Sequence, residues 1–208
     1  MASGASTLQS PDAPRSDGRT ARSARTRQAV VEALLALLDD GNLRPTAREI
    51  AERAGVSLRS VYVHFDDLED LHAAAASHHA RTVLATRATV DASRPLDERI
   101  ADVARETARM LEATLAVRRA ASLQEPFSPA LAKSLSITRS VTRKELAHVF
   151  ASELDALEPE VRARRLAALC VAASSHGWET LRLHYELSSA DAHDVVADLM
   201  AAILGGTR

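Results

Sequence analysis

The chain has 208 residues, of which 46% are hydrophobic and 26% charged, and its formal net charge is −2. This length and composition are ordinary for one substantial soluble domain or two smaller ones. A single cysteine, Cys170, excludes an intramolecular disulfide and a thiolate zinc cluster, and it fits a reducing compartment. The longest apolar run, residues 166–173, is far shorter than the roughly 20 residues that a transmembrane helix needs. We therefore expect a cytoplasmic protein with no membrane partner.

Helix-forming alanine and leucine are abundant, whereas glycine and proline number only seven each. No strand-like alternation, repeat or heptad run is present. The composition therefore predicts an all-α protein with about nine helices. We expect a flexible arginine-containing tail over residues 1–22, because its composition offers too little apolar surface to offset chain entropy. A small helical domain over 23–67 and a larger one over 68–208 follow.

Three helices are predicted in the small domain. The first runs over about 23–40 and carries an apolar stripe on one face. Thr46, followed three residues later by Glu49, forms a capping-box pattern that opens the second helix, and Gly55 suits its left-handed exit. Ser57 then caps a short third helix.

The larger domain is predicted to begin with a long alanine-rich helix that starts near Asp66 and Glu69 and ends near residue 91. Pro129 and Pro159 stand at the first turns of two later helices. These later helices are expected over about 96–117, 118–124, 129–156, 159–187 and 190–204.

Two helices joined by a glycine-containing turn, with the second helix short and capped by serine, match the geometry of a helix-turn-helix. In that motif the second helix enters the DNA major groove. The charge distribution agrees, because residues 1–65 hold nine arginines and seven acidic residues, a net charge of +2, and the remainder carries −4. Any attraction to phosphate must therefore come from the N-terminal third.

The stretch RPTAREIAERAGVSLRSVYVHFDDLEDL, residues 44–71, resembles the N-terminal signature of TetR-family transcriptional regulators. The rest of the chain is similar more loosely, through helix order and the segment SSHGWETLRLHYELSSADA. The resemblance implies a homodimeric, ligand-responsive repressor that binds a palindromic double-stranded DNA operator and is released by an unknown small-molecule effector. It implies neither a cofactor nor catalysis. The sequence departs from the family's pattern at Leu68, where the family commonly has a lysine that contacts phosphate.

The resemblance also assigns DNA contacts. Thr46 and Tyr62 would bond phosphates, and His64 would lie on the DNA backbone near the end of the recognition helix. The groove-facing residues would be Ser57, Leu58, Arg59 and Ser60. Among them Arg59 is the candidate for recognising guanine, since its planar guanidinium group can donate hydrogen bonds to O6 and N7 of guanine at the same time. The tail arginines that would compensate for the missing lysine are Arg22, Arg25 and Arg27.

Simpler interpretations stay open. Tyr62 can be a hydrogen-bonded core side chain, His64 a helix cap and Arg59 an ordinary solvated arginine. The whole motif can be a structural corner in a helical enzyme or metal-binding protein. Eight histidines make a metal worth considering, but His72 and His79 stand two helical turns apart, too far for direct co-ligation. The sequence also has no glycine-rich phosphate-binding loop and no serine in a nucleophile-elbow motif, so we expect neither a metal site nor a catalytic site.

Small residues recur along the helix after Pro159, and apolar residues line the last helix. The resemblance implies that both helices pair with their symmetry mates in a four-helix bundle. Its candidate contacts are Cys170, Ser174, Gly177, Val196, Met200 and Ile203. Alternatively, both stripes close the monomer's own core, where Cys170 would be a buried structural thiol and no redox sensor.

The central helices, over about 68–187, would enclose the effector cavity if the family's architecture holds. Large adaptable or aromatic side chains are the candidates for lining it, although each can equally be ordinary core. They are Met110, Phe127, Phe150 and Trp178.

Overall fold

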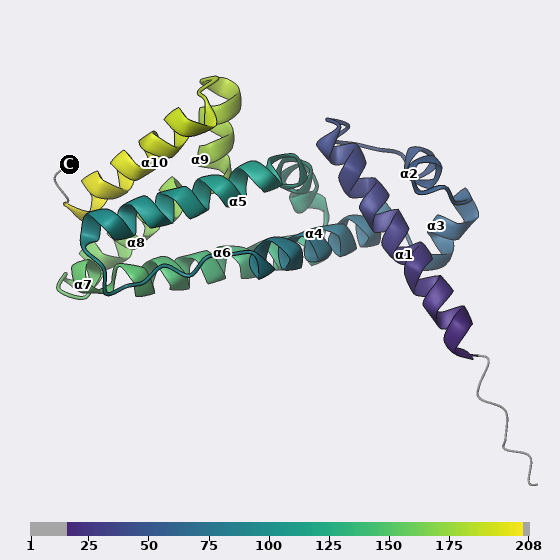
Figure 1. The fold of residues 1–208 in the computed structure, drawn as a ribbon, viewed down its shortest axis with the longest axis horizontal. Helices are drawn as coiled ribbons and strands as arrows, with labels where there is room; N and C mark the ends of the chain where they lie inside the picture. Colours follow the sequence, from purple (N-terminus) through teal and green to yellow (C-terminus); the bar gives the residue numbers. More distant parts are fainter. Residues whose placement is uncertain (1–15, 206–208) are drawn as a thin grey trace, which may run out of the picture.

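The computed structural model describes residues 16–205, which form ten α-helices and no strand, so the all-α prediction is confirmed. Figure 1 shows an elongated molecule with α1, α2 and α3 at one end. The helices are α1 (Ser16–Asp39), α2 (Ala47–Ala54), α3 (Leu58–His64), α4 (Leu68–Ala85), α5 (Leu96–Gln124), α6 (Pro129–Val149), α7 (Ala151–Leu154), α8 (Pro159–Ala172), α9 (Ser175–Glu179) and α10 (Ser189–Leu204). A 3-10 turn, η1 (Glu125–Phe127), follows α5, and a π-helical segment, η2 (Thr180–His184), follows α9.

Helices α1–α3, which we call the N-terminal unit, have their own hydrophobic core. The stripe on α1 buries Val30, Leu34 and Leu38 against Ile50 of α2 and Phe65 after α3. Helix α4 and the end of α5 complete this core with Leu71, Ala75, Val117 and Ala120. The unit is therefore packed directly on the first and second helices of the remaining chain, which we call the C-terminal body (α4–α10).

Two helix boundaries in the first half differ from the sequence predictions. Helix α1 begins at Ser16, so residues 16–22, predicted to be flexible, are helical; the rest of the predicted tail lies outside the described residues. Alanine and arginine favour helix there, and no proline interrupts the segment. Helix α4 ends at Ala85, short of residue 91. In the following segment the Asp91 carboxylate accepts hydrogen bonds from the backbone and hydroxyl of Ser93, a local pairing that competes with helix.

Helix boundaries in the C-terminal body also differ. The two helices predicted over 96–124 are one continuous helix, α5. The long helix predicted over 129–156 breaks at Phe150, whose side chain is fully buried and whose backbone leaves the helical region. The helix predicted over 159–187 ends at Ala172, and Ser174 caps a new helix, α9. Both breaks turn the chain so that large side chains enter the core.

Helix α5 runs through the middle of the C-terminal body and packs against α4, α6, α9 and α10 (Figure 1). The core around it includes the fully buried side chains Phe150, Leu154, Leu169, Trp178 and Met200. No helix in the described part of the chain has the length and apolarity for crossing a bilayer.

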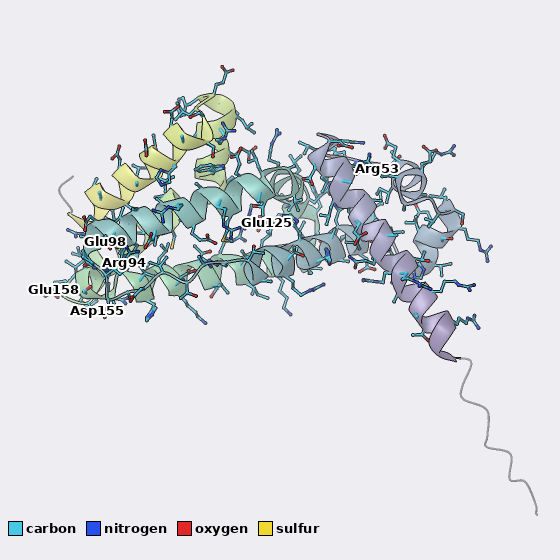
Figure 2. The ribbon with its side chains drawn as sticks, viewed as in Figure 1. Arg53, Arg94, Glu98, Glu125, Asp155 and Glu158 are labelled. Atoms are coloured by element: carbon cyan, nitrogen blue, oxygen red, sulfur yellow. The ribbon has the colours of Figure 1, made fainter. Side chains whose placement is uncertain are left out.

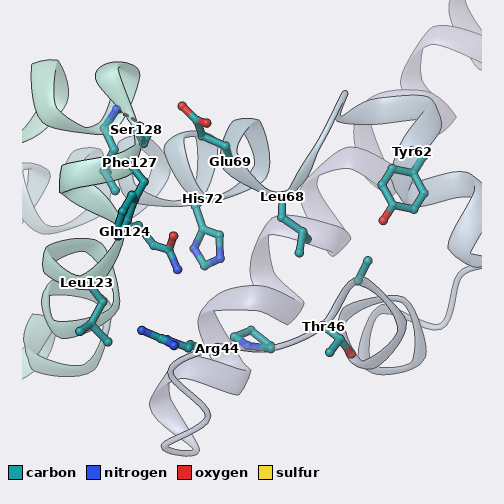
Figure 3. Close-up of a pocket in the computed structure, with 13 residues that line it drawn as sticks. Arg44, Thr46, Tyr62, Leu68, Glu69, His72, Leu123, Gln124, Phe127 and Ser128 are labelled. Carbon is teal, nitrogen blue, oxygen red and sulfur yellow. Dashed lines mark hydrogen bonds between the residues drawn. The ribbon is translucent and has the colours of Figure 1, made fainter.

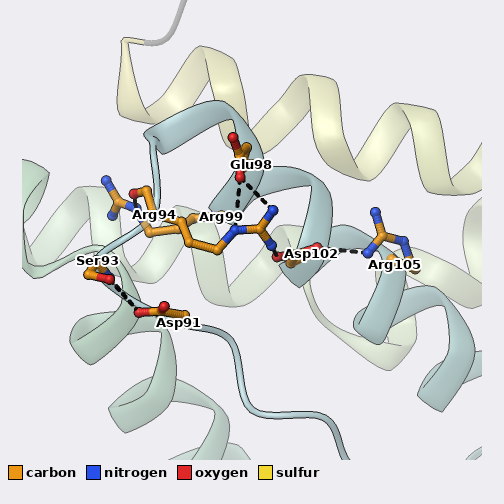
Figure 4. Close-up of polar contacts among 7 residues, drawn as sticks. All are labelled: Asp91, Ser93, Arg94, Glu98, Arg99, Asp102 and Arg105. Atoms are coloured by element: carbon orange, nitrogen blue, oxygen red, sulfur yellow. Dashed lines mark hydrogen bonds and ion pairs between the residues drawn. The ribbon is translucent and has the colours of Figure 1, made fainter.

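Charged side chains gather at the end of the body far from the N-terminal unit, where Figure 2 labels Arg94, Glu98, Asp155 and Glu158. Here Arg94 pairs with Glu98 and Asp102 at the start of α5, as Figure 4 shows. Arg99, 4% exposed, points inward instead and bonds the backbone and Glu153 at the α6–α7 junction. This end of the α5–α6 pair is therefore closed by charge-assisted bonds.

Candidate nucleic-acid interface

Local hydrogen bonds fix the geometry of α2 and of the turn that follows it. The Thr46 hydroxyl accepts from the Glu49 backbone N–H at 3.3 Å, while the Glu49 carboxylate accepts from the Thr46 backbone N–H at 2.7 Å. These bonds from Thr46 hold the pKa of the Glu49 carboxyl below its usual value. Gly55 adopts φ 66°, and Val56 N–H then bonds the Ala51 carbonyl. The predicted capping box and left-handed exit are both present.

The short helix α3 is held from one side only. Ser57 caps it by accepting from the Ser60 N–H at 3.1 Å. Val61 and Phe65 are 1% and 2% exposed and fix α3 to α1 and α2. The remaining surface faces outward, with Arg59 exposed. Exposed large side chains include Leu58, Tyr62 and Val63.

Tyr62 is 51% exposed, so the interpretation of this residue as core does not describe the structure. His64 is half-buried at the last turn of α3, a position compatible with either a helix cap or a DNA contact. The structure thus brings together on one outward surface the predicted contacts Ser57, Leu58, Arg59, Ser60 and Tyr62.

The three arginines predicted to act from a flexible tail lie on α1 instead. Arg22 and Arg25 are exposed on its N-terminal half. Arg27 lies over the Phe65 ring, with its guanidinium carbon 4.7 Å from the ring centroid. Because Phe65 ends α3, this cation–π contact joins α1 to the recognition helix. Leu68, at the position where a lysine was expected, packs partly buried against the N-terminal core.

A groove with a volume of about 650 Å³ separates the N-terminal unit from the C-terminal body (Figure 3). Thr46 and Tyr62 line its N-terminal side, and Phe127, 77% exposed, lines the opposite side. His72 lies between them, and burial lowers the pKa of its imidazole. Phe127, predicted to line a central effector cavity, therefore faces the gap beside the proposed phosphate contacts.

Arg118 of α5 lines three further cavities between helices of the C-terminal body. The largest, about 300 Å³, is bounded by α5, α6, α8 and the start of α9. Met110 lines the other two, each of about 50 Å³. Phe150 and Trp178 line none of these three, because both are fully buried in the core, where Trp178 Nε1 donates to Glu112 at 2.9 Å.

The predicted dimer contacts lie on different faces. Val196 and Met200 are 1% and 0% exposed within a single chain and pack in its core, and Ile203 is half-buried beside them. Cys170 and Ser174 line the 300 Å³ cavity. Gly177 is half-buried in α9 near the Ser174 cap. Exposed apolar side chains on these helices are instead Val171 of α8 and Leu199 of α10.

Cys170 is partly buried, and burial raises the pKa of its thiol. A raised pKa disfavours the thiolate, which is the reactive form. Within residues 16–205, His, Cys, Asp and Glu side chains form no group of three that is suited to holding a metal ion.

Two arginines were missed by sequence reasoning, Arg99 and Arg118. Both lie inside the C-terminal body, although arginine is normally a surface residue. The sequence offers little to single them out among the other arginines of α5.

The fold and the outward surface of α3 define an all-helical protein in which a helix-turn-helix is joined to a larger helical body. Residues 30–75 match the model of the family described as bacterial regulatory proteins, tetR family. No curated protein matches the chain.

Solved structures share the fold over most of the chain. A transcriptional regulator from Rhodococcus sp. Rha1 is 19% identical, with a TM-score of 0.64, over 88% of this chain and 96% of its own. A putative TetR-family transcriptional regulator from Mesorhizobium loti is 18% identical, with a TM-score of 0.62, over 88% and 97%. The multidrug binding protein EbrR, solved with imidazole, is 20% identical, with a TM-score of 0.55, over 86% and 94%.

The resemblance to TetR-family transcriptional regulators is therefore confirmed, by the family model in the N-terminal third and by the fold over the rest. Helix-turn-helix domain and fold together support a DNA-binding transcriptional regulator. The matched family is described as regulatory proteins, and two of these three structures are described as transcriptional regulators.

Proposed function

We propose that the protein is a homodimeric repressor that binds a palindromic DNA operator through α3 and is released by a small-molecule effector. The observation that carries the proposal is the outward surface of α3. Two buried anchors, Val61 and Phe65, hold the helix, while Arg59 and Tyr62 face away from the protein. A purely structural corner has no need to present arginine, serine and tyrosine together on a capped, outward-facing helix.

DNA binding is proposed to divide between positioning and reading. Thr46 and Tyr62, from the start of α2 and the middle of α3, lie on the same side of the unit and line one groove, which suits two contacts to a DNA backbone. Arg59 is exposed and makes no ion pair among the described residues, so its planar fork is free for a guanine edge.

Dimerisation is proposed through the outer faces of α8 and α10. These helices pack side by side, and Val171 and Leu199 are 68% and 46% exposed on them. Val196 and Met200 support that surface from inside the monomer. A two-fold dimer presents two copies of α3, which is why we propose a palindromic operator.

Effector response is proposed to act through α4. This helix contributes Leu71 and Ala75 to the N-terminal core and His79 to a cavity inside the C-terminal body. A ligand that binds one position of α4 better than another shifts the spacing of the two α3 helices. The boundary between the DNA-binding domain and the effector-binding domain is proposed to lie between residues 67 and 68, and α4 is the helix that couples the two.

The test selects bound fragments from genomic DNA and then measures Arg59 variants on the selected duplex. Arg59→Ala should weaken specific binding by about 1–3 kcal/mol and random DNA by less. Arg59→Lys should keep random binding and relax the preference at one symmetric pair of positions. Arg105→Ala, an exposed arginine of α5, is the control for the lost charge. Equal weakening on all sequences would make Arg59 a backbone contact, and failure to select any duplex would overturn the proposed function.

A further inference from the structure

The interior of the C-terminal body contains a cation without a matching anion. Arg118, near the C-terminal end of α5, lines all three of these cavities. Its one hydrogen bond among the described residues is from Nε to the Thr114 hydroxyl, at 2.8 Å. Burial lowers the pKa of the guanidinium, with no acidic group offsetting the effect.

Every carboxylate that lines these cavities is already paired with another arginine. Glu106 bonds Arg109 at 2.7 Å, and Glu125 bonds Arg139 at 2.6 Å. The third lining carboxylate is in an ion pair as well, Glu145 with Arg87. No lining carboxylate therefore pairs with Arg118. Arg118 is half-buried, and a partly desolvated charge without an ionic partner is costly to the fold.

A second polar group, on α4, lines one of these cavities. His79 of α4 lines the same cavity as Arg118, and its Nε2 is buried with no hydrogen-bond partner. Burial is the largest influence on the pKa of the imidazole and lowers it, while Asp39 opposes this shift and Arg118 adds to it. A neutral imidazole carries a proton on one of its two ring nitrogens. The Arg118 fork and the His79 ring thus offer donors to one group from two helices.

We propose that the effector is a monocarboxylic acid whose carboxylate binds between Arg118 and His79. One uncompensated positive charge matches a monoanion, whereas a phosphate dianion would leave excess negative charge in the cavity. The planar fork of arginine fits the two oxygens of a carboxylate. This inference names the ligand class for the effector site of the proposed function and rests on it.

The remainder of the acid would occupy the 300 Å³ cavity, which shares the lining residues Arg118, Leu135 and Thr138 with the cavity at His79. That volume is at the lower end for ligand pockets, so a small acid is expected. Cys170 and Ala173 give its walls apolar surface. A carboxylate held by both α4 and α5 would fix the position of α4, the helix that also packs in the N-terminal core.

Binding is tested on the full chain with a panel of aromatic, straight-chain and hydroxy monocarboxylates, each beside its neutral primary amide, and with inorganic phosphate. Trp178, the single tryptophan, reports by fluorescence because α9 begins at the cavity wall. At least one acid should bind, and its amide should bind at least about tenfold more weakly. Equal binding of acid and amide, phosphate binding alone, or no acid bound at millimolar concentration would overturn the proposal.

Variants separate a ligand contact from a structural one. Arg118→Met should weaken binding of the acid at least about tenfold and leave the melting temperature without ligand unchanged or raised, since a half-buried charge without an ionic partner is removed. Arg118→Lys, which keeps the charge and loses the fork, should fold and bind more weakly. Arg105→Met is the matched control on the same helix. A melting temperature of Arg118→Met several degrees below that control, or unchanged acid binding in both Arg118 variants, would overturn the proposal.

The two proposals fail in different ways. A protein that binds the selected duplex and no carboxylate leaves the proposed function standing and removes the inference. A protein that binds the acid through Arg118 and selects no DNA removes the proposed function, and the acid site then has another role. Release of the selected duplex by the acid, with Arg118→Met insensitive to it, supports both.

Discussion

Removing the partner of Arg99 should destabilise the C-terminal body strongly. The Arg99 side chain is 5% exposed and that of Glu153 is 18% exposed, and two hydrogen bonds of 2.6 and 2.9 Å join them. Glu153→Ala deletes both bonds and leaves the guanidinium buried. Two carbonyl bonds remain, from Arg99 to Arg94 and Val149 at 2.8 and 2.7 Å, so part of its charge stays solvated by dipoles.

The expected loss is about 3 kcal/mol, at the lower end of the roughly 3–5 kcal/mol seen when one partner of a buried pair is removed. Arg99→Met should cost less, because the Glu153 left behind reaches water more easily. The double variant Arg99→Met with Glu153→Leu should be close to wild type, since no unpaired charge remains.

Urea unfolding at fixed protein concentration measures these values, with concentration held constant because a dimer's apparent stability depends on it. Arg105→Met, which removes an exposed pair with Asp102, is the control and should change stability by less than about 0.5 kcal/mol. If Glu153→Ala lowers the free energy of unfolding no more than this control does, the Arg99–Glu153 pair does not stabilise the packing of α5 against α6 and α7, and the reasoning from burial is wrong.

Three further outcomes are expected. Hydrogen bonds from Arg99 hold the pKa of Glu153 below its ordinary value. The stabilisation from this pair is therefore present above the unfolded-state pKa and is lost as the pH falls through the folded-state pKa. Between about pH 5 and 3 the wild type should lose more stability than Glu153→Gln in urea titrations. Tyr62→Phe should weaken specific and random duplexes alike by about 1–2 kcal/mol at matched salt, without altering dimerisation, and unchanged anisotropy titrations would remove the phosphate contact. Leu199→Asp, on the surface, should give a folded monomer, whereas Met200→Asp should unfold; sedimentation of Leu199→Asp as a dimer would exclude α10 from the interface.

The helix-turn-helix was accessible from sequence because its determinants are local. Thr46, Gly55 and Ser57 act within three or four residues of their own position, through caps and a left-handed turn. The anchors Val61 and Phe65 follow from helical spacing, which also leaves Arg59 and Tyr62 on the outer side. Short-range hydrogen bonds and helical periodicity depend on residues that are close in sequence, so the sequence alone predicts them.

The interior of the C-terminal body was less predictable, because helical periodicity identifies the apolar face of a helix but not the helix or subunit that packs against it. Val196 and Met200 form such a face, and only packing against α5 and α8 shows that it belongs to one chain's core. Phe127 and Phe150 look alike in sequence, yet one is exposed at the groove and the other fully buried.

The sequence by itself therefore determined the helical class, the caps and turn of the DNA-binding motif and the side chains that α3 presents. The tertiary structure alone decided that Arg99 is buried and Arg118 half-buried, since the environment of each depends on helices that are distant along the chain. Arg99 meets Glu153 across 54 residues, and Arg118 meets no acid at all among the described residues. The physical reason is that the energy of a charge depends on the dielectric and the partners around it, which are set by long-range packing.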